Sequence, residues 1–478
     1  MEEASMPLRS KKRMMKQLQC SERTTQLMEL PLDILLDILS RLPTRSLFSL
    51  LCVSKNLRSL VDCPSFAHEH SQYIATTNYE DLDPSHVMVL TNSQLITLRA
   101  LNPLSPFSEF AFDISNSLRN GFNLKLVSYG LLLFNKKEST TNDQALLLLV
   151  NPLMGEVLNL PPPPTTIFYE ALPPRWNYEL YGMGYDAMTS THKIVRLSRP
   201  GPKHNLVAQI YELGTGFSLS WRQISSVPPP SCCLSSKNCV SAYGNMHWLV
   251  NGFSSDLEFR ILSFDFKREE FEWTPHTNLP DFGKRSVLHL INFRGRLAIV
   301  DVTAISSPKN IHHHDQIEIW VMKSYKNFTW EKKYAVEIDL DPCCMKSWET
   351  PFRFHGVGPG SVGAWEHGIF LRDITSTKSK NVVVFLDVDS GGIRAVQVGS
   401  SSMSDCDDLM PVNVFSYTGG YISLRKYGDL MEAETGERNF FSVGKMMQRS
   451  MLTRDDTIFY WGDDAEVNVA KVSRRKVH

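Results

Sequence analysis

Hydrophobic residues recur with a helical spacing in one short part of the chain, residues 28–66. The first stripe consists of Ile34, Leu35, Ile38, Leu39 and Leu42. Residues three or four positions apart share one face of a helix, so this stripe predicts an amphipathic helix. Pro31 suits the first turn of that helix, and Pro43 ends it because proline cannot continue a helix.

Two further short helices are predicted in the same segment. Thr44 and Ser54 each offer a hydroxyl group that can cap the start of a helix. The apolar positions behind the two caps are Leu47, Leu50, Leu51 and Val53, and then Leu57, Leu60 and Val61. Such a small bundle buries too little apolar surface to be robust alone. We therefore expect an interaction module of three short helices that commits one hydrophobic face to a partner.

From about residue 85 onward the helical stripes disappear and the hydrophobic period becomes two. Apolar runs recur in pairs separated by polar turns, which predicts antiparallel hairpins. The predicted pairs are 130–134 with 145–150, 208–213 with 220–222, 246–250 with 260–266, 296–302 with 316–322, and 368–373 with 381–388. Outer strands are expected at 271–273, 329–338 and 393–398.

The hairpins repeat along the chain at a nearly regular interval. Their central turns are at Asn151, Glu212, Asp265, Met322 and Asp387. The steps of roughly 53 to 65 residues are close to the kelch period of about 50. A repeat of strand, hairpin and outer strand without helices indicates a β-propeller, and about six blades fit residues 75–425. An open sandwich is the alternative, but a sandwich would need no repeat.

Two stretches fall outside this repeat. The proline-rich residues 160–164 cannot lie inside a central strand, so they suit a stiff connection between blades. Residues 426–478 are more polar, and only 457–461 has the pattern of a strand. The pattern leaves open whether this C-terminal tail closes the ring or hangs free.

Composition places the chain among ordinary globular proteins. It has 478 residues, of which 21% are charged and 42% hydrophobic, and a formal net charge of -1. A charge near zero gives no general attraction to nucleic acid or to anionic membranes. No apolar run approaches the roughly 20 residues of a membrane helix, and the basic tail at 1–24 lacks the apolar stretch of a secretory signal. With nine scattered cysteines, these features favour the cytoplasm, the nucleus or both.

Several patterns that suggest chemistry are better explained by structure. Gly358, Gly360 and Gly363 have the spacing of a dinucleotide-binding fingerprint, but Pro359 interrupts it and a strand pattern follows where a helix is required. The three histidines at 312–314 would point to alternate faces of an extended segment, so they do not form a metal site. We expect no metal and no cofactor.

The candidate catalytic side chains are also better explained by structural roles. His247 stands beside Trp248, but a histidine in this position is expected to brace the sheet. Asp186, Asp265 and Asp387 recur at predicted turns, where aspartate satisfies backbone N–H groups. We therefore expect no catalytic residue.

Certain segments resemble a known family. Residues 30–43 closely resemble the opening of a plant F-box, and residues 53–61 resemble its third helix. Later motifs are similar to the F-box-associated domain of the same family, namely Asn151-Pro152 with Gly155-Glu156, and the segments 181–186, 244–249 and 262–265. The family usually has tryptophan where Leu57 stands and a basic residue where Ser49 stands.

The resemblance implies a substrate-recognition subunit of an SCF-type (Skp–cullin–F-box) ubiquitin ligase. The F-box would bind a Skp-type adaptor, and through it a cullin, while the propeller would bind an unknown target protein. The chain itself would be non-catalytic. The adaptor-binding residues carried over are Leu30, Pro31, Ile34, Leu35, Ile38, Leu39, Leu42, Pro43 and Leu47. The F-box core would include Val53, Leu57 and Leu60.

The expected fold class is α+β: a small three-helix F-box followed by an all-β propeller of about six blades. The predicted units are a flexible basic tail at 1–24, the F-box at 25–70, the propeller at 75–425 and the polar tail at 426–478. Two other functions stay open, a propeller enzyme with a helical appendage and an adaptor-binding scaffold that directs no ubiquitin transfer.

A target-binding surface is expected near a proline-stiffened stretch. The candidate residues are Phe168, Tyr169, Trp176 and Tyr178. Large aromatic side chains on a stiff loop suit protein recognition, because they lose little entropy on binding. The competing explanation is that these rings pack beneath a connection between two blades.

Overall fold

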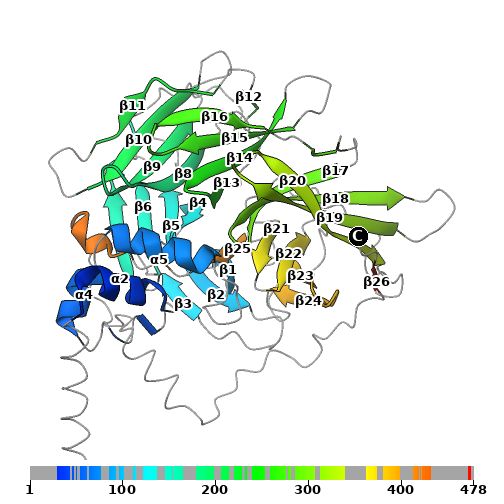
Figure 1. The fold of residues 1–478 in the computed structure, drawn as a ribbon, viewed down its shortest axis with the longest axis horizontal. Helices are drawn as coiled ribbons and strands as arrows, with labels where there is room; N and C mark the ends of the chain where they lie inside the picture. Colours follow the sequence, from blue (N-terminus) through cyan, green and yellow to red (C-terminus); the bar gives the residue numbers. More distant parts are fainter. Residues whose placement is uncertain are drawn as a thin grey trace, which may run out of the picture.

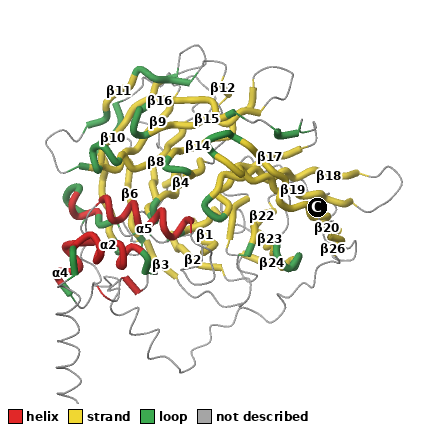
Figure 2. The backbone as a smooth tube through the Cα atoms, viewed as in Figure 1, coloured by secondary structure: helices red, strands yellow, loops and turns green. Residues whose placement is uncertain are grey.

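The computed structural model describes a helical module, the strands of a β-domain and parts of the C-terminal region (Figures 1 and 2). The described residues are 30–42, 46–47, 50, 54–61, 64–76, 86–92, 96–101, 111–114, 122–136, 146–152, 154–164, 179–198, 206–214, 220–228, 232–233, 239–252, 259–275, 278–280, 282, 286–306, 313–339, 362–365, 367–373, 381–398, 413–418, 420, 422–431 and 472–474.

The helical module contains α2 (Leu32–Ser40), α4 (Lys55–Val61) and α5 (Pro64–Thr76). As predicted, α2 follows Pro31, and the Ser54 hydroxyl accepts a hydrogen bond from the Leu57 N–H at 3.3 Å. Helix α5 was not predicted, because its apolar positions form no clear stripe. Pro64 begins this helix, where the missing N–H group costs nothing.

The described strands pair into six separate antiparallel sheets, here called blades 1 to 6. Blade 1 consists of β25 (Asn413–Tyr417), β1 (His86–Asn92), β2 (Ile96–Leu101) and β3 (Ala111–Ile114). Blade 2 consists of β4 (Phe122–Ser128), β5 (Leu131–Lys136), β6 (Leu147–Asn151) and β7 (Glu156–Leu160). Blade 3 consists of β8 (Glu179–Asp186), β9 (Thr191–Ser198), β10 (Val207–Leu213) and β11 (Arg222–Ile224).

Blades 4 and 5 each have five strands, and blade 6 has four. Blade 4 consists of β12 (Cys232–Cys233), β13 (Cys239–Ala242), β14 (Asn245–Gly252), β15 (Phe259–Asp265) and β16 (Glu270–Thr274). Blade 5 consists of β17 (Ser286–Phe293), β18 (Arg296–Ser306), β19 (His313–Ser324), β20 (Thr329–Asp339) and β26 (Val472–Arg474). Blade 6 consists of β21 (Val362–Trp365), β22 (Gly368–Asp373), β23 (Asn381–Asp387) and β24 (Ile393–Val398).

The innermost strands contact one another in a closed circle. The order is β25, β4, β8, β13, β17, β21 and again β25. Hydrophobic clusters fill the spaces between neighbouring blades. The predicted order, helices first and then an all-β propeller, is therefore confirmed, and the strand pairs predicted from the period of two are present. The predicted strand at 457–461 lies outside the described residues.

The ring is closed by β25, which pairs with β1 from the start of the domain. Closure therefore uses residues 413–417 and not the tail beyond residue 425. After β25 the chain passes along blade 2 and forms the short 3-10 helix η4 (Leu424–Lys426). Farther on, β26 adds a strand to the outer edge of blade 5.

Tight turns lie on one face of the propeller. The two-residue hairpins with positive φ at both positions are Tyr129-Gly130, Tyr243-Gly244 and Arg294-Gly295. Such turns match the twist of antiparallel strands. The turns that follow the third strands, such as β6–β7 and β15–β16, lie on the same face, because strands alternate in direction. We call this the tight-turn face.

Candidate functional site

Helix α2 carries two sets of hydrophobic side chains with opposite exposure. Leu35 and Leu39 are 2% and 1% exposed, whereas Ile34 and Ile38 are 47% and 40% exposed. A helix makes a turn in about 3.6 residues, so adjacent positions face different directions. The sequence predicted one apolar face, but in the structure these residues lie on two different faces of α2. One part supports the helical module from inside, and the other faces solvent.

The inner set forms the core of the helical module. The core residues are Leu35, Leu39, Leu47, Leu57, Val61 and Phe66. Leu57 is almost fully buried in this cluster, so an apolar residue smaller than tryptophan fills the position. Leu60 is half-buried at its margin. Val53 and Ser49 lie outside the described residues.

Ile34 and Ile38 of α2, together with Leu30 just before the helix begins, form what we call the outer row of α2. All three are exposed. An ion pair between Asp37 Oδ2 and Arg41 Nη2, at 2.8 Å, lies beside this row. Clustered exposed apolar side chains with a charged margin are typical of a protein-binding surface. The outer row is therefore the candidate adaptor-binding surface.

The other predicted adaptor-binding residues occupy different positions. Pro31 is exposed, Leu42 is half-buried and Pro43 lies outside the described residues. Leu35, Leu39 and Leu47 are buried, so they can only support the surface from beneath. Leu32 is exposed at the start of α2 although its helical position is shared with the inner set. Leu32 was not among the predicted adaptor-binding residues, because the hydrophobic period does not show which residues of a helical face other helices cover.

Helix α5 joins the helical module to the propeller. Figure 1 shows α5 as the helix nearest to the sheets, and it contacts β9. The imidazole of His68 stacks on the Tyr185 ring with centroids 4.3 Å apart, and the Tyr129 ring lies 6.0 Å away. Within the module, His70 Nε2 lies 2.9 Å from the carbonyl oxygen of Leu42, just after α2, so α5 contacts both units. The two units are therefore in direct contact across the tight-turn face.

The junction is built from neutral aromatic rings. Burial lowers the pKa of His68 to about 4 and the pKa of His192 to about 3. His192 lies behind the junction, with its ring centroid 5.2 Å from that of Tyr129 and 5.1 Å from that of Tyr185. Within the described part of the chain neither nitrogen of His192 has a hydrogen-bond partner. Both histidines are therefore uncharged near neutral pH.

A buried lysine joins the tight turns of blades 3 and 4. Lys193 Nζ lies 2.6 Å from Asp186 Oδ2 and 2.7 Å from Glu269 Oε1. Burial opposes ionisation of Asp186, but hydrogen bonds from Lys193, the Met188 N–H and Thr189 hold its pKa below the ordinary value. The same two carboxylates raise the pKa of Lys193, although burial acts in the opposite direction. This cluster stays charged and connects the two blades.

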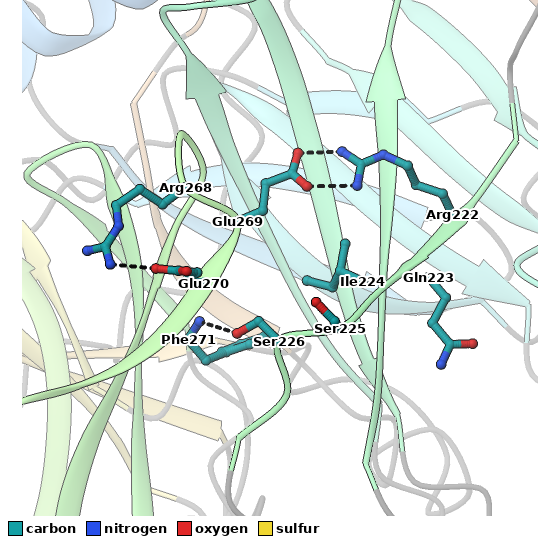
Figure 3. A pocket seen from close by; sticks show the side chains of 9 residues that line it. All are labelled: Arg222, Gln223, Ile224, Ser225, Ser226, Arg268, Glu269, Glu270 and Phe271. Atoms are coloured by element: carbon teal, nitrogen blue, oxygen red, sulfur yellow. Dashed lines mark hydrogen bonds and ion pairs between the residues drawn. The ribbon is translucent and has the colours of Figure 1, made fainter.

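An open depression of about 670 Å³ lies beside this cluster (Figure 3). Its lining residues are Arg222, Gln223, Ile224, Ser225, Ser226, Arg268, Glu269, Glu270 and Phe271. Figure 3 shows the Arg222 guanidinium facing the Glu269 carboxylate, with Arg222 Nη1 2.7 Å from Glu269 Oε2. Arg268 is paired with Glu270 in the same way. The charges in this depression therefore satisfy one another.

Other sequence candidates have structural positions. His247 is fully buried, with Nδ1 2.6 Å from the Ser263 hydroxyl and Nε2 3.1 Å from the Ala242 carbonyl oxygen, so its predicted bracing role is confirmed. Gly363 was expected in a loop but lies in β21, and the strand β22 follows it instead of a helix, as expected. Among the described residues no group of three or more His, Cys, Asp or Glu side chains could hold a metal ion. None of the described helices is long and apolar enough to cross a membrane.

The predicted target-binding residues Phe168, Tyr169, Trp176 and Tyr178 lie outside the described residues. The described strand ends on either side are Leu160 in β7 and Glu179 in β8. Leu160 pairs with Leu147 and Glu179 pairs with Ser198, at the ends of the strands away from the tight turns. These strand ends therefore lie on the face of the propeller opposite to the helical module.

Comparison with known proteins gives consistent matches. Residues 86–417 match a model described as "F-box associated beta propeller domain", and residues 27–69 match the F-box domain. The chain is 25% identical to an F-box/LRR-repeat protein of Arabidopsis thaliana, over 67% of this chain and 70% of that protein. It is 24% identical to the F-box protein CPR1 of Arabidopsis thaliana, over 89% of this chain and 97% of that protein.

Likeness to solved structures is weaker. A polysaccharide lyase of family PL25, an ulvan lyase, covers 65% of this chain and 78% of its own with a TM-score of 0.31 and 9% sequence identity. A likeness of this degree carries no argument about function.

Proposed function

The chain belongs to the F-box proteins that carry an F-box associated β-propeller domain, and from this membership we propose that it is the substrate-recognition subunit of an SCF-type ubiquitin ligase. In this proposal the F-box binds a Skp-type adaptor and, through it, a cullin. The propeller binds the protein to be ubiquitinated. The chemical step belongs to other subunits, and this chain contributes proximity by tethering the target.

One observation carries the proposal: the outer row of α2 is exposed while the inner set holds the module together. Leu30, Ile34 and Ile38 expose large apolar side chains that the described part of the chain leaves accessible to solvent. Exposed apolar anchors of this kind supply most of the binding energy in protein interfaces. The row is therefore available to an adaptor without any rearrangement of the bundle.

The position of the helical module supports a division of labour between the two faces of the propeller. Helix α5 occupies the tight-turn face through His68, Tyr129 and Tyr185. The opposite face includes the strand ends at Leu160 and Glu179 and is directed away from the F-box. We assign target binding to that opposite face, and recognition through Phe168, Tyr169, Trp176 and Tyr178 stays a prediction.

Adaptor binding is tested by a paired substitution in the outer row. Ile34→Ser with Ile38→Ser removes two exposed apolar anchors and leaves the inner set intact. We expect the affinity for a purified Skp-type adaptor to fall at least about tenfold, equivalent to about 1.4 kcal/mol. A matched control is Met188→Ser with Val227→Ser, two residues of the propeller that are 73% and 40% exposed. If the native protein, the outer-row variant and the control variant bind the adaptor with equal affinity, the outer row is not the adaptor-binding surface.

Localisation forms part of the same proposal. We propose that the protein resides in the cytoplasm, the nucleus or both. The support is the basic cluster near the N-terminus, with Arg9, Lys11, Lys12 and Arg13, which has the composition of an import signal. Imaging of a fluorescent fusion, with and without these four residues changed to Ser, measures the nuclear share and the contribution of the cluster.

A further inference from the structure

The β6–β7 turn of blade 2 carries the family-like motif Asn151-Pro152 with Gly155-Glu156 and contacts two other parts of the molecule. Asn151 ends β6 and Glu156 begins β7. Between them, Met154 packs against the core of the helical module. On the other side of the turn lies the segment that follows the ring-closing strand, residues 420 and 422–431, which we call the strap. The turn therefore lies between the F-box and the strap.

Asn151 uses both ends of its side-chain amide. Oδ1 accepts a hydrogen bond from the Met154 N–H at 3.2 Å and so caps the turn. Nδ2 donates to the carbonyl oxygen of Ile422 at 2.8 Å, and the carbonyl oxygen of Gly420 lies 3.5 Å away. The side chain is fully buried, so loss of these partners would leave polar atoms unsatisfied. The contacts join residues that are about 270 positions apart in the sequence.

The equivalent residues of other blades show what is special about Asn151. Asp265 ends β15 and Asp387 ends β23, each at the same place in its blade. Asp265 Oδ1 accepts hydrogen bonds from the backbone N–H groups of Lys267 and Arg268. Asp387 Oδ1 accepts them from the backbone N–H groups of Asp389 and Ser390. A carboxylate suffices to cap a turn, but only an amide can also donate to a carbonyl group. Asparagine at 151 can therefore both cap the turn and donate a hydrogen bond to the strap, which aspartate could not do.

Glu156 holds the strap at a second point. Its carboxylate is almost fully buried and accepts hydrogen bonds from the Leu424 N–H at 2.6 Å and from Arg425 Nε at 2.9 Å. The Met431 N–H then donates to the Val157 carbonyl oxygen at 2.9 Å. Charge-assisted hydrogen bonds in a buried site are among the stronger polar contacts. The strap is therefore fixed along the outer edge of blade 2.

The strap also reaches the junction between the F-box and the propeller, at Tyr129. Ile422, Leu424 and Tyr427 belong to the same buried hydrophobic cluster as Ala67 of α5. Gly420 fits closely beneath the junction, because a Cβ atom there would lie 1.7 Å from the Tyr129 carbonyl oxygen. The strap that Asn151 and Glu156 hold therefore lies against Tyr129, whose ring centroid is 6.0 Å from that of His68 on α5.

We propose that Asn151 and Glu156 are positioning residues that set the orientation of the F-box relative to the propeller, by holding the strap against Tyr129 at the junction with α5. This inference rests on the proposed function, in which the F-box holds the ligase and the propeller holds the target. Ubiquitin transfer depends on the distance between the two, so a loosened junction lowers the effective concentration of the target at the ligase. Adaptor affinity is unaffected, because the outer row of α2 is made without the strap.

The orientation is measured in the full chain by electron-spin distance spectroscopy. Spin labels are attached to encoded non-natural side chains at the exposed positions Asn56 in α4 and Lys326 in the β19–β20 turn, so that native cysteines stay unlabelled. We expect one narrow distance distribution in the native sequence. Asn151→Asp keeps the turn cap and removes the donor to the strap, so we expect the distribution to broaden about twofold. Glu156→Gln, a second variant of the same shape, should broaden it as well.

Asp265→Asn is the matched control, because it alters the same turn position in a blade without a strap. Hydrogen exchange of peptides covering 420–431 and 64–76 reports whether strap and helix loosen together, with exchange roughly tenfold faster expected in Asn151→Asp. Release of the strap without any change in the distance distribution would overturn the proposal, and so would equal broadening in Asp265→Asn. If the adaptor fails to bind the native chain, the proposed function is wrong, while the distances still test the positioning role.

Discussion

The imidazole of His68 on α5 stacks on the phenol ring of Tyr185 in β8, with the ring centroids 4.3 Å apart. This contact joins the helical module directly to blade 3. Because the two rings come from units separated by more than a hundred residues, the stack fixes how one unit sits on the other. Its consequences concern the pH dependence of stability, the packing between units and the relative orientation of the F-box and the propeller.

The His68 contact makes the stability of the protein dependent on pH. The folded pKa of His68, lowered to about 4 by burial, lies below the value of about 6.5 expected in an unfolded chain. A group with a lowered folded pKa favours the folded state above its unfolded pKa, and this contribution is lost as pH falls from about 6.5 toward 4. We expect His68→Phe to reduce the loss by up to about 1.4 kcal/mol per pH unit in that window. Denaturant unfolding at several pH values measures it. Parallel pH profiles for the two proteins would show that His68 is not buried as described.

Lys193 should be important for the contact between blades 3 and 4. Lys193→Met leaves the carboxylates of Asp186 and Glu269 without their shared counterion, and Asp186 is almost fully buried. Removing one partner of a buried ion pair costs about 3–5 kcal/mol. The control is Arg268→Ala, which breaks exposed ion pairs and should leave the free energy of unfolding nearly unchanged, because solvent screens exposed charges. Similar losses in both variants would contradict a special role for Lys193.

Gly184, in the segment 181–186 of the family-like motif, is required by packing between blades. A Cβ atom at Gly184 would lie 2.0 Å from the Phe266 ring of blade 4. Gly184→Ala forces Phe266 to move, and we expect a loss of about 1–3 kcal/mol in the free energy of unfolding. Gly214→Ala is the comparison, because nothing lies within 4 Å of a Cβ atom there. A thermal melt of Gly184→Ala that matches the native protein would contradict the close approach.

Leu57 should be needed for the outer row although it does not touch solvent. Leu57→Ala removes buried volume beside Leu35 and Leu39, at a cost of about 2–5 kcal/mol. The module then holds α2 less firmly, so adaptor affinity should fall together with stability. Leu60→Ala, at the half-buried margin, should have a smaller effect on both. Adaptor titration and thermal unfolding of the two variants give the comparison.

The strands and their pairing could be predicted from the sequence because short apolar runs are separated by turn residues. Runs such as 296–302 and 316–322 are close in the sequence and pair with each other, so their partners are local. The same holds for the cap of α4 by Ser54, which acts within three residues. Contacts between residues that are close in the sequence can therefore be predicted from the sequence alone.

The junction and the strap could not be predicted in the same way. The division of α2 into Leu35 and Leu39 inside and Ile34 and Ile38 outside depends on where the other helices pack. Asn151 was recognised as part of a motif, but its partner Ile422 is about 270 positions away in the sequence. Helix α5 has a weak apolar pattern because its contacts are rings such as His68. Tertiary contacts, and not periodicity, decide these features.

The central claim is that the outer row of α2 links targets on the propeller to ubiquitin transfer. The most direct measurement is affinity purification of the native chain and of Ile34→Ser with Ile38→Ser from cells with the proteasome inhibited, followed by mass spectrometry of partners and of their ubiquitin remnants. We predict that both proteins capture the same targets. Only the native chain should also bring the adaptor and cullin and yield targets rich in ubiquitin remnants. Targets that are ubiquitinated equally with both proteins, or a native chain that captures no adaptor, would contradict the account.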